Sequence, residues 1–63
     1  MFNELTTQEV IDLQYAVRTA RLQSYRRVFL EDQEDDQYEQ SLRATCSKVN
    51  DLCEEELNNR WGR

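Results

Sequence analysis

The stretch VFLEDQEDDQY, residues 28–38, lies at the centre of a symmetry in the apolar residues of this chain. Moving outward from Gln33, apolar or small residues on one side match such residues on the other, and the residue numbers of each pair add up to 66. The pairs are Val28 with Tyr38, Ser24 with Leu42, Ala20 with Cys46, Val17 with Val49, Leu13 with Cys53, and Leu5 with Trp61. Along each half the inner five positions are spaced by three or four residues, and the outermost lies eight residues further on, which is typical of one face of a helix. The pattern predicts an all-α fold, an antiparallel hairpin of two helices.

We expect a single domain over residues 1–63, with helices over about 6–30 and 36–59 and an acidic turn over about 31–35. Thr6 and Glu9 have the spacing of a capping box at the start of the first helix. Asp35 or Asp36 is suited to cap the second helix. One continuous helix is the competing architecture, and it is disfavoured because its heptad seam would carry several charged residues.

Charge is distributed unevenly along the chain, whose net charge is −5. Residues 31–39 hold six acidic side chains and no basic one, whereas residues 1–30 hold three acidic and four basic ones. An acidic protein lacks the basic face that duplex-DNA binding needs. There is no secretory apolar region and no apolar run of about 18 residues, so we expect a cytoplasmic protein without membrane contact. A calcium loop at residues 31–36 is an alternative, but the central glycine and the ligand spacing of an EF-hand are missing.

The two cysteines, Cys46 and Cys53, lie seven residues apart. Along one helix this separation places their Cα atoms about 10.5 Å apart, beyond the roughly 7 Å that a disulfide tolerates. Two cysteines without a histidine do not complete a zinc site, so we expect no metal and no cofactor. We interpret both as small apolar core residues, with a disulfide across a dimer or a redox sensor as the alternative.

The first expected helix carries a second apolar group, about 140° around the helical wheel from the core stripe. Its members are Ile11, Tyr15, Leu22, Tyr25 and Phe29. Folding back covers only one of the two groups, and soluble monomers seldom expose a large apolar patch. We therefore expect two hairpins to join through this helix, with Leu52 alongside, as a homodimeric four-helix bundle. A groove of a different protein is the alternative partner for this group.

Several charged residues are suited to recognition. Arg18 and Arg21 lie between the two apolar groups and are expected either to pair with Glu54, Glu55 or Glu56, or to contact RNA. In the second case they would act with Tyr25 and Arg26 on phosphates and bases. An acidic surface for a protein partner would comprise Asp35, Asp36, Glu39, Glu54 and Glu55.

The chain has no histidine, no glycine-rich phosphate loop and no nucleophile beside a plausible base, so we expect a protein without catalytic activity. The leading hypothesis is a small acidic protein-interaction module, an adaptor or an inhibitor of a larger protein, that acts as a homodimer. An RNA-binding dimer and a structural subunit of a larger complex are the alternatives.

In length, charge and hairpin layout, and loosely in the segment from Leu57 to Arg60-Trp61-Gly62, the chain resembles the Rop family. That resemblance implies a four-helix-bundle dimer that binds RNA. The terminal Trp61-Gly62 is also similar to the end of the NblA proteolysis adaptors, which are short helical hairpins. Both resemblances concern architecture, because aromatic and aliphatic residues replace the polar RNA-contacting pattern of the first Rop helix, and architecture alone does not imply function.

Overall fold

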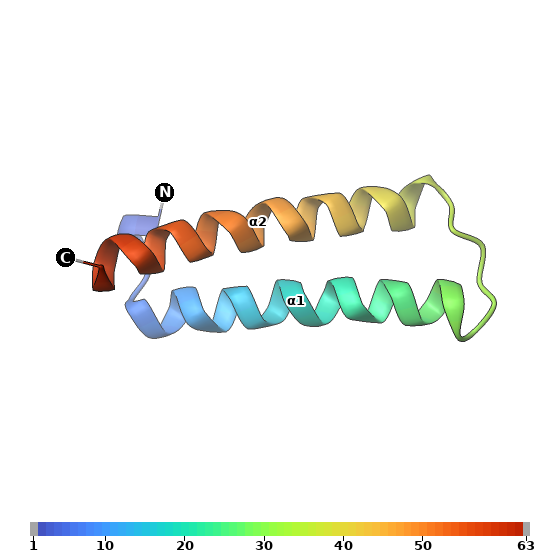
Figure 1. Cartoon of the computed structure of the whole chain (residues 1–63), viewed down its shortest axis with the longest axis horizontal. Helices are drawn as coiled ribbons and strands as arrows, with labels where there is room; N and C mark the ends of the chain where they lie inside the picture. Colours follow the sequence, from blue (N-terminus) through green and yellow to red (C-terminus); the bar gives the residue numbers. More distant parts are fainter. Residues whose placement is uncertain (1, 63) are drawn as a thin grey trace.

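The computed structural model describes residues 2–62, which form a helical hairpin (Figure 1). A short 3-10 turn, η1 (Phe2–Glu4), precedes the two long helices, α1 (Thr7–Phe29) and α2 (Gln37–Trp61). The helices run antiparallel beside each other, so that both chain ends lie at one end of a rod of 44 × 18 × 17 Å. The linker between α1 and α2 closes the other end. The predicted all-α hairpin is confirmed.

Both long helices begin at the caps that the sequence predicts. The Thr6 hydroxyl accepts a hydrogen bond from the Glu9 amide at 3.1 Å, and the Glu9 carboxylate accepts one from the Thr6 amide at 2.8 Å. This reciprocal pair satisfies two amides that have no partner inside the helix. Of the two aspartates proposed for α2, Asp36 is the cap, and its carboxylate accepts from the Glu39 amide at 3.0 Å.

The linker reverses the chain without a glycine. Asp32 adopts a positive φ of 60°, a conformation that aspartate tolerates better than most side chains. Around it the Gln33 amide donates to the Arg27 carbonyl at 2.9 Å, and the Leu30 amide donates to the Arg26 carbonyl at 2.9 Å. These bonds satisfy carbonyls that the end of α1 would otherwise leave free, so the turn is fixed by backbone contacts.

The apolar core lies towards the end of the hairpin that holds the chain termini. Val10, Cys53 and Leu57 form a buried cluster. Partly buried side chains that pack against this cluster are Phe2, Leu5, Ile11, Leu13 and Val49. Cys46 is buried nearer the start of α2, and both cysteines are free thiols. The burial of both side chains confirms their interpretation as core residues. Neither long helix in residues 2–62 combines the length and the apolar character needed to cross a membrane.

Two of the predicted facing pairs are wrong at their α2 member. Tyr38 is the predicted partner of Val28, but its side chain is 69% exposed, and the neighbouring Glu39 is buried instead. The reason is that Ser24 and Arg27 direct three hydrogen bonds into this end of the hairpin, which the two oxygens of a carboxylate accept together, whereas a phenol offers a single oxygen. Trp61, the predicted partner of Leu5, is 63% exposed. The side chain of Arg60 reaches the Leu5 carbonyl in its place, at 2.9 Å.

Candidate interaction surface

The hairpin leaves the second apolar group of α1 largely in solvent. Tyr15, Leu22 and Phe29 are 73%, 59% and 68% exposed, and Tyr25 is 44% exposed. We call Tyr15, Leu22, Tyr25 and Phe29 the outer face of α1. Their spacing brings them to one side of the helix, away from buried Val10 and Ser24. An apolar strip of this kind is typical of a surface that binds another molecule.

Two contacts order the linker end of the outer face. The rings of Tyr25 and Phe29 stack with their centroids 6.0 Å apart and their planes 19° from parallel. The Arg43 guanidinium from α2 lies 4.9 Å from the centroid of the Tyr25 ring, within range of a cation–π interaction. These contacts hold two aromatic rings in defined positions before any partner binds. A surface with less freedom to lose binds with a smaller entropic penalty.

Two other residues expected in the interface lie differently. Ile11 is half-buried and packs against the core cluster, so it joins the outer face to the interior. Leu52 is also half-buried, but it lies nine residues after Arg43 on α2, which is about 180° around the helix. Because Arg43 contacts the outer face, Leu52 lies on the opposite side of the hairpin. The structure therefore does not bring Leu52 together with the outer face.

Arg18 and Arg21 of α1 do not form the ion pairs with Glu54, Glu55 or Glu56 that the sequence suggested. Arg18 donates from Nε to the Asn50 side-chain oxygen at 2.8 Å, rather than to a glutamate. Arg21 and Arg26 make no hydrogen bond or ion pair through their side chains with any residue in 2–62. Glu54 and Glu55 are exposed on α2. The positive charges of Arg21 and Arg26 are thus available next to the outer face.

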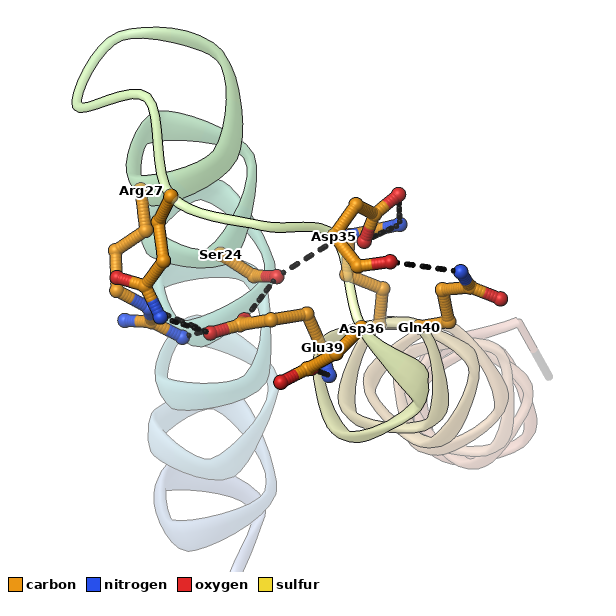
Figure 2. A network of polar contacts seen from close by, with 8 residues as sticks. Ser24, Arg27, Asp35, Asp36, Glu39 and Gln40 are labelled. Carbon is orange, nitrogen blue, oxygen red and sulfur yellow. Dashed lines mark hydrogen bonds and ion pairs between the residues drawn. The ribbon is translucent and has the colours of Figure 1, made fainter.

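A polar network closes the linker end of the hairpin (Figure 2). Glu39, 2% exposed, reaches from α2 towards α1, where its carboxylate accepts from the Ser24 hydroxyl at 2.7 Å. It also accepts from Arg27, through Nε at 3.0 Å and Nη2 at 2.9 Å, and from the Gln33 side-chain amide at 3.3 Å. The hydrogen bonds from Arg27 and then Ser24 hold the pKa of Glu39 below its ordinary value. Glu39 therefore stabilises the hairpin from inside and does not belong to an exposed acidic surface.

Arg43 connects this network to the outer face. Its Nη1 donates to the Ser24 hydroxyl at 3.1 Å, while its Nη2 pairs with the Asp35 carboxylate at 3.0 Å. The same guanidinium is the one that lies over Tyr25. Asp35 and Asp36, both proposed for recognition, are thus engaged within the hairpin, one in this ion pair and one as the α2 cap. Arg43 is not among the site residues predicted from the sequence, because contacts with residues on other elements leave no periodic signal.

A second arginine, Arg60, connects the two helices at the end of the hairpin that holds the chain termini. Arg60 donates to the carbonyls of Phe2 and Leu5, both at 2.9 Å, and to the Thr7 hydroxyl at 3.1 Å. Its Nε also pairs with the Glu56 carboxylate at 2.7 Å, so Glu56 is not free to bind an arginine of α1. These bonds tie the segment before α1 to the last turn of α2. With the network around Glu39, they fix both ends of the rod, and the outer face stays exposed between them.

Comparisons of the chain with protein-family models, with curated proteins and with solved structures find no match. Within residues 2–62, no three acidic, cysteine or histidine side chains gather as metal ligands. The outstanding chemical feature of this part of the chain is an ordered apolar strip beside two unpaired arginines.

Proposed function

We propose that this chain is a non-catalytic protein-interaction module that acts as a homodimer, assembled through the outer face of α1. The observation that carries the proposal is the exposure of Tyr15, Leu22 and Phe29 on one side of a helix whose other side already packs against α2. In the proposed dimer the two α1 helices lie between the two α2 helices, which gives a four-helix assembly with twofold symmetry.

The energy available at the outer face is large for so small a protein. Aromatic side chains bury about 150–250 Å² each, and Tyr15 and Phe29 are 73% and 68% exposed. Covering the exposed part of each at about 25 cal/mol per Å² contributes about 3 kcal/mol. A single core of this size supplies only about 3–5 kcal/mol of stability. The transfer free energy available at the outer face is thus of the same order as the net stability of one hairpin, before the entropic cost of association is subtracted.

The surface left outside such a dimer is the acidic one, which we propose as the contact for a larger protein. Glu31, Asp32 and Glu34 project from the exposed linker, and Glu54 and Glu55 from α2. None of these five carboxylates makes a side-chain ion pair within residues 2–62. They offer a basic partner an unneutralised surface, which favours fast, salt-dependent association.

A matched pair of substitutions tests the homodimer. Tyr15→Asp places a charge in the outer face, whereas Tyr38→Asp makes the same change at a tyrosine with 69% exposure on α2. In sedimentation equilibrium we expect the unaltered chain and Tyr38→Asp to have twice the 7.6 kDa mass of the chain, and Tyr15→Asp to have that mass once. A dimer that persists in Tyr15→Asp removes the outer face as the interface.

The RNA-binding alternative makes a different prediction at the arginines of α1. If Arg18 and Arg21 contact phosphates, replacing both with alanine abolishes a gel shift that weakens steeply with salt. If the protein is the module proposed here, affinity capture from the host lysate retains the same protein partner with and without nuclease. Loss of the captured partner on nuclease treatment would favour the RNA-binding dimer.

A further inference from the structure

We infer that the two α1 helices of the dimer pair in antiparallel orientation, with Asp12 of each copy against Arg26 of the other. The inference rests on the proposed homodimer and adds its orientation and the residues that select it. The spacing of the outer face is regular. With Ile11 and Arg18 included, the positions are 11, 15, 18, 22, 25 and 29, alternating steps of four and three. That alternation is the heptad repeat of a helix seam that packs against a second helix.

The seam is symmetric about its middle, which lies near residue 20. When the α1 helix of a second copy packs antiparallel against this seam, each seam position faces another seam position of that copy. The facing pairs are Ile11 with Phe29, Tyr15 with Tyr25, and Arg18 with Leu22. The aromatic and aliphatic side chains thus meet one another at both ends of the seam. A twofold axis requires this kind of self-complementary surface.

Charged residues lie on both flanks of the seam. Asp12, Thr19 and Arg26 recur every seven residues along one flank, and Gln14, Arg21 and Val28 along the other. In an antiparallel pair, like flanks of the two helices run side by side. Asp12 of one copy then meets Arg26 of the other, twice in the dimer, while Thr19 meets its own equivalent at the centre.

Both members of this pair are available for it. Asp12 is exposed, and from residues 2–62 its side chain receives only a hydrogen bond from the Gln8 side chain of the same helix, at 3.0 Å. Arg26 is exposed and makes no side-chain hydrogen bond or ion pair with residues 2–62. By contrast, Arg27 is held by Glu39 and Arg43 by Asp35. Arg26 is therefore one of the arginines on α1 whose charge is still unmatched.

A parallel pair would be opposed by the same charges. In that orientation unlike flanks meet, which brings Arg21 of one copy beside Arg26 of the other at two places. The antiparallel pair contains one like-charged contact, between the two Arg21 side chains at the centre. Two attractive contacts against one repulsive contact favour the antiparallel orientation, and repulsion against the wrong orientation adds specificity.

Charge exchange at these two positions tests the inference in the full-length chain. Asp12→Arg alone and Arg26→Asp alone each place like charges together at both contacts, so each should weaken the dimer by about 10- to 30-fold. The double variant, Asp12→Arg with Arg26→Asp, restores attraction and should return to the affinity of the unaltered chain. An equimolar mixture of the two single variants should form a heterodimer, because both of its contacts are then free of the like-charge repulsion that each single variant meets with itself.

The mixture also separates a failed interface from a failed fold, since variants that pair with each other must be folded. A parallel dimer gives a tighter association for Arg26→Asp, because the carboxylate introduced at position 26 would then face Arg21, and that result overturns the orientation while the dimer stands. A dimer indifferent to both single changes overturns the inference in the same way. A monomeric unaltered chain at millimolar concentration overturns both the proposed function and this inference.

Discussion

Replacement of Leu57 by alanine should lower the stability of the hairpin, because Leu57 is one of the three buried residues of its apolar cluster. Leu57 is only 6% exposed and belongs to a cluster with Val10 and Cys53, so almost its whole side chain is removed from water. Loss of its transfer free energy, together with the cavity left behind, costs about 2–5 kcal/mol in protein cores. In this hairpin the partly buried Phe2 and Leu5 pack against the cluster and can settle into the gap, so we expect about 2–3 kcal/mol.

Urea denaturation followed by circular dichroism measures this loss. With a slope of about 1 kcal/mol per molar urea for a small protein, the midpoint should fall by about 2–3 M. Leu30→Ala is the matched control, because Leu30 is 75% exposed and its loss should change stability by less than about 0.5 kcal/mol. Both variants are compared at one protein concentration, since association raises apparent stability. Equal losses at Leu57 and Leu30 would refute the placement of the core.

Three further outcomes are expected. The pKa of Glu39 is lowered in the folded chain, so the unfolded chain takes up a proton at higher pH than the folded chain does. The contribution of Glu39 to stability is therefore retained above about pH 4.3 and is lost as the pH falls towards the lower pKa of the folded chain. Glu39→Gln should remove that share of the acid sensitivity, measured as the difference between urea midpoints at pH 7 and pH 3. Thr6→Ala should lower stability by about 1 kcal/mol through loss of the capping box, with Thr45→Ala on the exposed side of α2 as a near-neutral control. Burial raises the pKa of the Cys53 thiol, so its reaction with an aromatic disulfide reagent should be slow and should accelerate in urea in step with unfolding. Rapid labelling of Cys53 in native buffer would contradict its burial.

The hairpin, its helix caps and its buried cysteines could be predicted from the sequence, because each depends on residues close together along the chain or on apolar spacing. The hairpin follows from apolar spacing, and the caps at Thr6 and Asp36 follow from side chains that satisfy amides three residues ahead. The burial of Cys46 and Cys53 follows from their place in the apolar stripe. The helix bounds differ from those expected by one or two residues, because a cap lies just outside the helix that it begins and because α2 continues to Trp61.

The polar ends of the hairpin could not be predicted in the same way. A hydropathy pattern assigns Glu39 to solvent, and its burial depends on Ser24 and Arg27, which lie 15 and 12 residues earlier. Arg60 similarly depends on carbonyls more than 50 residues away. In the apolar part of the candidate site, Tyr15, Leu22, Tyr25 and Phe29 are exposed on one side of α1, and their role in an interface stays a prediction. Leu52 lies on the other side of the hairpin. Its side chain points away because a helix rotates by about 100° per residue, and only the pairing with α1 reveals which side α2 presents.

The proposed homodimer is tested most directly by the mass of the unaltered chain in sedimentation equilibrium, followed from micromolar to millimolar concentration. We expect a reversible change from 7.6 kDa to twice that mass, with the Tyr15 and Phe29 rings losing solvent exposure over the same concentration range. A single species of 7.6 kDa at every concentration, with both rings still exposed, would contradict it.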